Sequence, residues 1–157
     1  VATVNWPEVE FDTVTRLRIL AAARPHLRYA ETTIAAPFER VWSIAGDMEN
    51  GTPRFETGLT RVRIVERDGN RLRLTAAGRL GPTLELEAEL RSGWCLMWSG
   101  PLEIGIAATP TANGTRTRLA HFEGVRGTGP LLAPIFWLKI RRELRSLSRL
   151  VLKQPLP

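Results

Sequence analysis

The sequence predicts an α+β fold in which one curved antiparallel sheet packs against a long C-terminal helix. In residues 59–125 apolar and polar side chains alternate with the period of strands, and turn signals rich in Gly, Pro and Asn separate the runs. Beyond residue 129 apolar residues recur instead at helical spacing, to about residue 152. A further strand over residues 27–35 precedes both regions, so we expect seven strands. A sheet and a helix that each have one apolar face bury those faces by packing together.

The composition is that of one folded domain, with 157 residues of which 43% are hydrophobic and 24% charged. A chain of this length buries roughly two-thirds of its unfolded surface and needs no metal or disulfide to fold. Cys95 is the single cysteine, which excludes an internal disulfide and favours a reducing, cytoplasmic location. No apolar run approaches the ~20 residues of a membrane span. These features exclude a secreted disulfide scaffold, an integral membrane protein and a multidomain enzyme.

Residues 1–26 are predicted to form an N-terminal extension that is partly helical, ahead of a main domain over residues 27–153. Phe11, Val14, Leu17 and Ala21 recur at helical spacing within residues 8–23. The pattern ends at Arg24-Pro25. The sequence leaves open whether this extension caps a cavity or forms a dimer contact, and whether the protein is a monomer or a homodimer.

Two short helices are predicted between the first and second strands. Pro37 ends the first strand and stands at a position that helices tolerate, followed by Val41, Trp42 and Ile44 on one apolar side. The glycines and the proline that follow break the region into a second, irregular helical piece near residues 48–54.

Alternation within the strands predicts which side chains share a face. Val62 and Ile64 share a face with Leu72 and Leu74 if the connecting loop has an odd number of residues, and the loop 68–70 supplies three. Residues 83–90 alternate Leu or Ala with Glu, the pattern of a strand with one buried face. For residues 94–99 the parity is undecided: either Leu96 and Trp98 or Cys95 and Met97 point inward.

Asn113-Gly114 predicts a two-residue hairpin that sets the register of the last two strands. This register places Ile104 opposite Glu123 and Ile106 opposite His121. His121 and Glu123 are therefore expected on the apolar, concave face, with Arg116 and Arg118 pointing to water.

The C-terminal helix separates apolar from basic residues. One side carries Leu132, Phe136, Ile140, Leu144, Leu147, Leu150 and Val151, and the other carries Lys139, Arg141, Arg142, Arg145, Arg149 and Lys153. Glu143 falls on the apolar side, where we expect it to pair with Lys139 at i, i+4 or to face a cavity.

Three segments carry a resemblance to a known family: residues 29–37 (YAETTIAAP) running into 39–42 (ERVW) and Asp47, residues 121–124 (HFEG), and residues 129–131 (GPL). Over residues 27–153 the chain resembles the START/polyketide-cyclase (SRPBCC) superfamily, and within it the polyketide cyclase/dehydrase-like branch. The resemblance implies a helix-grip fold: a seven-stranded curved antiparallel sheet around a long C-terminal helix, with two short helices between strands 1 and 2. It also implies a deep cavity between the sheet and the long helix, for which pockets of ~300–1,000 Å³ are typical.

Within this cavity His121 and Glu123 are the candidate catalytic residues or ligand-orienting pair, since histidine titrates near neutral pH. The competing interpretation is that a neighbouring hydroxyl or backbone group satisfies His121 and that Glu123 lies near solvent. The candidate ligand-binding residues line the concave face and the mouth expected for such a cavity: Phe55, Leu74, Leu86, Ile104, Ile106, Leu119, His121, Phe136 and Ile140.

Several other chemistries find no support in the sequence. His26, His121 and Cys95 lack the spacing of a zinc site, so we expect no metal, and no phosphate loop, dinucleotide motif or nucleophile elbow predicts a cofactor or a nucleophilic enzyme. The net charge of +6, with 20 Arg among 22 basic residues, suggests contact with anions. Pairing across strands, for instance between Arg73 and Glu89, is expected to neutralise much of one face, which argues against a specific nucleic-acid site.

These observations leave three functions open. The leading hypothesis is binding or transport of a small hydrophobic ligand, such as a lipid, a polyketide or an isoprenoid-like compound. The alternative is an enzyme, a cyclase or dehydratase that folds a polyketide chain in the cavity while His121 moves protons. The weakest hypothesis is peripheral contact with an anionic membrane or a macromolecule through Arg141, Arg142, Arg145 and Arg149.

Overall fold

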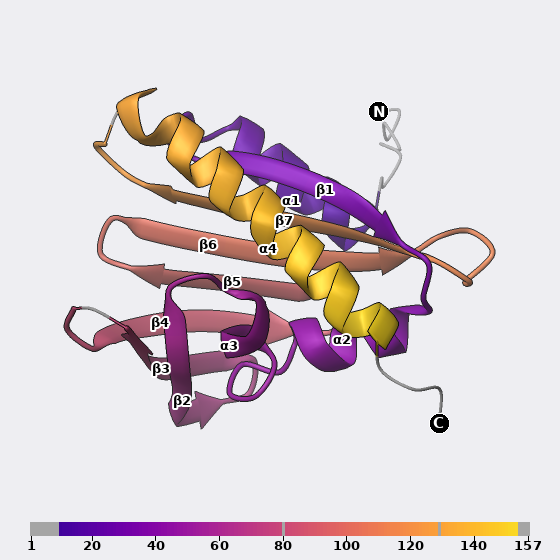
Figure 1. Cartoon of the computed structure of the whole chain (residues 1–157), viewed down its shortest axis with the longest axis horizontal. Helices are drawn as coiled ribbons and strands as arrows, with labels where there is room; N and C mark the ends of the chain where they lie inside the picture. Colours follow the sequence, from indigo (N-terminus) through magenta and orange to yellow (C-terminus); the bar gives the residue numbers. More distant parts are fainter. Residues whose placement is uncertain (1–9, 80, 129, 154–157) are drawn as a thin grey trace, which may run out of the picture.

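The computed structural model describes residues 10–79, 81–128 and 130–153, and its elements follow the predicted order. The seven strands form one antiparallel sheet in the order β1-β7-β6-β5-β4-β3-β2, which confirms the helix-grip architecture (Figure 1). The elements are α1 (Thr13–Ala22), β1 (Arg28–Ile34), α2 (Phe38–Ala45), α3 (Thr52–Phe55), β2 (Leu59–Asp68), β3 (Arg71–Gly78), β4 (Leu84–Arg91), β5 (Trp94–Ser99), β6 (Leu102–Pro110), β7 (Thr117–Val125), a 3₁₀ turn (Pro130–Leu132) and α4 (Ala133–Lys153).

The inner face of the sheet is covered unequally. Helix α4 crosses in front of β1, β7 and β6, whereas α3 and its loops lie in front of β3 and β4 (Figure 1). The main core fills the space between these helices and the sheet. On β5 this core includes Cys95 and Met97, so these two residues point inward and Leu96 and Trp98 point outward.

Helix α4 buries the predicted stripe through Ile140, Leu144, Leu147 and Val151, while Phe136 is only half-buried. The regular helix begins at Ala133, directly after the 3₁₀ turn. No helix within the described ranges is long and apolar enough to cross a membrane.

The β2–β3 hairpin turns the predicted residues toward the inner face, but its loop is shorter than the one expected. Val62 lies opposite Ala76 and Ile64 opposite Leu74, so the apolar residues share the inner face as expected. However, Asp68 pairs with Arg71, and the loop has two residues rather than three. An irregularity between Ile64 and Glu66 supplies the odd residue, because a β-bulge places two residues opposite one and restores the parity.

The register predicted for β6 and β7 is confirmed, since Ile104 lies opposite Glu123 and Ile106 opposite His121. The connection is longer than the predicted two-residue hairpin: the strands end at Pro110 and Thr117, and the Thr111 N–H donates to the Arg116 carbonyl across the loop. The predicted and the observed loop are both centred between Asn113 and Gly114, so the longer loop leaves the register unchanged.

The predicted pairing of Arg73 with Glu89 is wrong by two residues along β4, on the outer face of the sheet. Arg73 lies opposite Glu87 and instead forms an ion pair with Glu66 at 2.9 Å, while Glu89 pairs with Arg91 at 2.7 Å. Ala76 lies opposite Leu84, so each residue of β3 faces a residue of β4 two positions earlier than the expected pair requires.

A second apolar core lies on the outer face, beneath α1. Val14, Leu17 and Ala21 of this helix pack on Ala120 and Phe122 of β7. Asp12 caps the helix by accepting a hydrogen bond from the Thr15 N–H. The described part of the extension therefore lies on the opposite side of the sheet from the main core, where it does not cap an inner cavity. Phe11, expected on the apolar side, is 46% exposed because it precedes the helix.

Candidate functional site

A buried polar cluster lies on the inner face where β7 meets α4. His121 of β7 and Glu143 of α4 form its centre, with 3.0 Å between Nε2 of the imidazole and Oε2 of the carboxylate. The strand alternation turns His121 inward, and the helix places Glu143 on its buried side. Both side chains are almost completely buried. Sequence analysis expected Glu123 as the partner of His121, whereas the structure gives that position to Glu143.

His121 is held between two hydrogen-bond acceptors. Its Nδ1 lies 2.8 Å from the Gly105 carbonyl oxygen, which can only accept, so Nδ1 carries a proton. Its Nε2 faces the Glu143 carboxylate, which favours a proton there too. Burial alone lowers the pKa of His121, but the hydrogen bond to Glu143 and the charges of nearby carboxylates raise it to about 9. A charged imidazolium with both nitrogens donating has no lone pair for a substrate proton.

Glu143 is the acceptor that connects the cluster to the loop after α3. Its Oε1 accepts hydrogen bonds from the Thr57 N–H at 2.7 Å and the Thr57 hydroxyl at 2.6 Å. The same oxygen lies 2.9 Å from Nζ of Lys139, the i, i+4 pair that the sequence predicted. Burial raises the pKa of Glu143, but the hydrogen bond and charge of His121, together with Lys139, lower it to about 2. Glu143 is therefore ionised at neutral pH.

Lys139 was expected on the solvent side of the last helix, and this expectation is wrong. Its side chain is 24% exposed, and its ammonium contacts the carboxyl groups of Glu123, Glu143 and Glu56. Burial lowers the pKa of Lys139, but these carboxylates raise it above its ordinary value. The flexible stem explains the difference, because it lets a lysine at the edge of an apolar stripe turn its charge toward buried partners.

Glu56, directly after α3, completes the cluster and was not identified from the sequence. Its Oε2 lies 3.3 Å from Lys139 Nζ, and its Oε1 lies 3.5 Å from His121 Nε2. Burial raises the pKa of Glu56 to about 7, against the opposing charge of Lys139. Both the neutral and the ionised forms of this carboxyl group are therefore accessible near neutral pH.

The cluster also has donor atoms that suit a metal ion. Glu56, His121, Glu123 and Glu143 each offer one ligand atom, and these atoms lie within 4.8 Å of one another. Sequence spacing did not reveal this set because its members come from β7, α4 and the loop after α3. The ammonium of Lys139 already contacts the three carboxyl groups and neutralises part of their charge, and His121 with two donating nitrogens has no free ligand atom.

An apolar pocket of about 200 Å³ adjoins this cluster. Glu56, Glu123 and Lys139 form its polar end. The pocket is smaller than the ~300–1,000 Å³ expected from the fold and typical of ligand sites. Its remaining lining comes from β2 to β6 and from the loop before β2: Thr57, Gly58, Leu59, Val62, Leu74, Ala76, Leu84, Leu86, Met97, Leu102 and Ile104.

A wider hollow of about 500 Å³ lies outside this inner pocket. The two share residues 56–59 as a common wall, so this segment separates the inner pocket from the surface. Arg79 and Arg142 line the outer hollow, and both are exposed. The outer hollow therefore has a positive rim and adjoins the inner pocket across residues 56–59.

The candidate ligand-binding residues fall into two groups. Leu74, Leu86 and Ile104 line the inner pocket. The others lie outside its lining: Phe55, Ile106, Leu119 and Ile140 are buried in the main core, His121 is in the polar cluster, and Phe136 is half-buried on α4. Glu123, the second candidate catalytic residue, borders the pocket beside Lys139.

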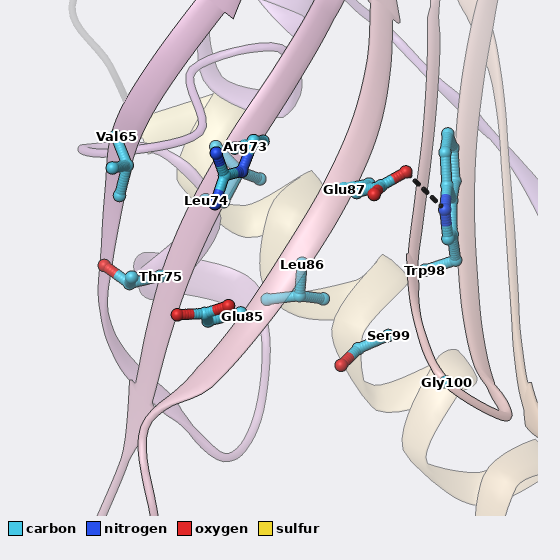
Figure 2. Close-up of a pocket in the computed structure, with 10 residues that line it drawn as sticks. All are labelled: Val65, Arg73, Leu74, Thr75, Glu85, Leu86, Glu87, Trp98, Ser99 and Gly100. Carbon is cyan, nitrogen blue, oxygen red and sulfur yellow. Dashed lines mark hydrogen bonds between the residues drawn. The ribbon is translucent and has the colours of Figure 1, made fainter.

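A larger hollow, of about 540 Å³, lies on the outer face of β2–β5 (Figure 2). Arg73, Glu85 and Glu87 point into it, while Leu74 and Leu86 belong to the opposite face. Trp98 is 37% exposed and donates through Nε1 to Glu87 at 3.1 Å. Because the walls are charged, exposed side chains, we place the candidate site in the smaller inner pocket, which has an apolar body and a buried polar end.

Cys95 lies in the main core rather than at the site. It is fully buried, with its sulfur 3.7 Å from that of Met48, and burial raises its pKa to about 12. Such a thiol is inert as a nucleophile.

Comparison with known proteins gives the fold and no sequence relative. No family model matches the chain, and no curated protein matches it. Among solved structures it is similar to the ZhuI aromatase/cyclase from Streptomyces sp. R1128, with a TM-score of 0.61 and 18% identity over 82% of this chain and 95% of that one. It is also similar to a START superfamily protein from Mycobacterium smegmatis, with a TM-score of 0.54 and 18% identity over 82% and 94% of the two chains. These likenesses establish a START-like helix-grip fold, as the resemblance predicted.

Proposed function

We propose that the chain binds a small apolar molecule in the inner pocket, with the polar end of the ligand against Glu56, Glu123 and Lys139. One observation carries this proposal: an apolar pocket ends on a buried cluster of charged groups. Apolar walls favour a ligand by removing its surface from water, and a few polar groups fix its orientation. The likeness in fold to START and aromatase/cyclase proteins supports the same class of function.

The polar end favours a ligand that donates a hydrogen bond. An ammonium has three hydrogens, and the Lys139 ammonium already contacts three carboxyl groups. Oε2 of Glu123 contacts Lys139, whereas Oε1 accepts no hydrogen bond from any residue in the described ranges. A hydroxyl or ring N–H on the ligand fits this free oxygen better than a carbonyl or a carboxylate does.

The pocket volume favours a compact ligand. At about 200 Å³ the inner pocket falls below the typical range for drug-sized molecules. We therefore expect a molecule of one or two rings, or the buried end of a larger one that continues into the outer hollow.

The test uses indole and benzofuran, two bicyclic probes of nearly equal shape, of which only indole has an N–H donor. We expect indole to bind about 10- to 100-fold more tightly, since a hydrogen bond to a charged acceptor contributes about 1.5–3 kcal/mol. Methyl and amide NMR shifts during titration give both affinity and location. Leu86→Trp, which fills the inner pocket, should abolish both binding events. Trp98→Ala, in the outer-face hollow, should leave them unchanged.

The outcomes separate the pocket from its polar preference. If neither probe binds, or if Leu86→Trp has no effect, the proposed function is wrong. If both bind equally and in the inner pocket, the pocket is correct and the donor preference is wrong. Glu123→Leu should reduce the ratio of affinities toward one while preserving the binding of benzofuran.

A second candidate function is acid–base catalysis in the same pocket, favoured by Glu56. Its carboxyl group borders both the inner pocket and the outer hollow, and its pKa of about 7 suits proton transfer at neutral pH. This assigns the proton transfer of a cyclase or dehydratase to Glu56 in place of His121. Turnover of a poly-β-keto substrate that Glu56→Gln abolishes, with indole binding retained, would support it. Absence of turnover in the unmodified protein would reject it.

A further inference from the structure

An apolar patch is exposed at the start of the last helix. Leu131 is 87% exposed, Ile135 61% and Leu138 59%, with Trp137 at 42% and Leu132 at 38% beside them. These side chains all lie within residues 131–138, on the 3₁₀ turn and the first turns of α4. Single exposed apolar residues are ordinary on a protein surface, whereas a contiguous group marks an interaction site.

The same helix continues the patch with a basic stripe. Ile135, Leu138, Arg142, Arg145 and Arg149 recur every three or four residues, so they form one line along the helix. This line points away from the buried side, which carries Ile140, Leu144 and Leu147. The outward side of α4 is thus apolar in its first half and basic in its second.

The charges on this surface indicate which kind of partner it fits. Glu143 is the only acidic residue of α4, and it is buried in the polar cluster, so the exposed side of the helix carries arginines without acids. Arg141 lies over the Trp137 ring, 4.5 Å from its centroid, which places a guanidinium at the border of the apolar patch. A second copy docked through the same surface would offer these arginines no acidic partner. An anionic lipid surface offers both the negative charge and an apolar layer.

We propose that α4 docks on an anionic membrane, with Leu131, Ile135 and Leu138 entering the interface and Arg142, Arg145 and Arg149 contacting lipid headgroups. Helices that combine apolar and basic residues in this way lie in the plane of the interface. Each arginine near such a surface contributes about 1 kcal/mol, and salt screens the contribution. Arg142 also lines the outer hollow, so the docked helix holds this hollow near the bilayer.

The experiment is co-sedimentation with phosphatidylcholine vesicles prepared with and without phosphatidylserine. We expect binding only to the vesicles with phosphatidylserine, and loss of that binding as salt rises. The pair Ile135→Ser and Leu138→Ser should weaken it at least tenfold, and so should the triple change of Arg142, Arg145 and Arg149 to Gln. All five positions are exposed, so circular dichroism should show an unchanged fold.

Matched variants distinguish binding through this patch from binding driven by net charge alone or by any exposed apolar residue. Arg61, Arg63 and Arg71, all exposed on β2 and β3, give a control triple change to Gln with the same loss of charge. Val65→Ser removes an equally exposed apolar residue elsewhere. Both controls should bind as the unmodified protein does. Equal weakening by the controls would overturn the proposal, and so would absence of vesicle binding. A dimer that Ile135→Ser and Leu138→Ser dissociates, without vesicle binding, would assign the patch to a second copy instead.

Discussion

The two faces of the sheet are stabilised by different chemistry at the same two strands. On the outer face of β6 and β7, the second core beneath α1 is apolar, formed by Leu17, Ala107 and Phe122. On the inner face of the same strands, His121 and Glu123 meet the charged groups of α4 and of the loop after α3. Alternation along a strand sends neighbouring residues to these two faces, so residues 120–123 contribute alternately to each.

Gly105 shows how closely the two faces are joined. On one side its carbonyl accepts from His121 Nδ1, and on the other a Cβ added at this position would lie 2.6 Å from the Phe122 ring. The outer core needs the missing side chain, and the inner cluster needs the carbonyl. The comparison teaches that the core beneath α1 is built from apolar packing, whereas the inner face keeps a cluster of buried charges that a purely structural core would replace with apolar groups.

The largest effect is expected from Glu143→Leu, which removes the carboxylate at the centre of the inner cluster. His121, Lys139 and the Thr57 N–H lose their acceptor in a buried site. Removing one partner of a buried ion pair costs about 3–5 kcal/mol. Chemical denaturation measures this loss. The matched control is Glu66→Leu, whose pair with Arg73 is about 60% exposed at both side chains and should contribute less than about 1 kcal/mol. Equal losses for the two variants would show that the inner cluster is not specially stabilising.

A comparable loss of stability, without removal of any charge, is expected from Leu17→Ala in the outer core. Leu17 is fully buried between α1 and the sheet, and truncating such a residue costs about 2–5 kcal/mol. Ile19→Ala, on the exposed side of the same helix, is the control and should change stability little. If the two faces are functionally separate, Leu17→Ala leaves the affinity for indole unchanged. A parallel loss of binding would show that α1 supports the pocket through the sheet.

The order and pairing of the elements were predictable because they follow from local signals. Alternation, turn residues and helical spacing indicated the elements and their order along the chain, while the family resemblance implied how they assemble. The pairing of Ile104 with Glu123 and of Ile106 with His121 followed from one turn at residues 113–114. The bulge near Val65 was not predictable in this way. A two-residue loop with a bulge and a three-residue loop without one turn the same residues toward the inner face.

The polar cluster was predictable only in part. Two of its members, His121 and Glu123, are visible from strand parity, and the pair of Glu143 with Lys139 is visible from helical spacing. Glu56 has no such signal, since it follows a four-residue helix whose position depends on packing against α4 and β2. Which acid meets His121 is decided by where α4 crosses the sheet, and no local pattern encodes that crossing.

The smallest effect per step is expected from pH, because one titrating group changes stability by at most about 1.4 kcal/mol per pH unit. Glu56 has a folded-state pKa of about 7 against an ordinary value of 4.5, so between these pH values the unfolded chain releases a proton that the folded protein keeps, and stability falls as pH rises. His121 has a folded-state pKa of about 9 against 6.5, so its stabilisation is complete below pH 6.5 and is lost as pH rises through 9. Together they predict a continuous fall in stability as pH rises from 5 to 9.

Thermal unfolding at several pH values tests the two contributions separately. Glu56→Gln cannot ionise, so it should flatten the slope between pH 5 and 7 and leave the fall between pH 7 and 9, where His121 titrates. Below pH 4.5 the sign reverses, because Glu143, with its pKa lowered to about 2, begins to take up protons in the unfolded chain first. Stability is therefore expected to be greatest near pH 5. A maximum at or above pH 8 would contradict an inner cluster in which His121 is charged and the pKa of Glu56 lies near 7. It would thereby weaken the contrast between this charged cluster and the apolar core beneath α1.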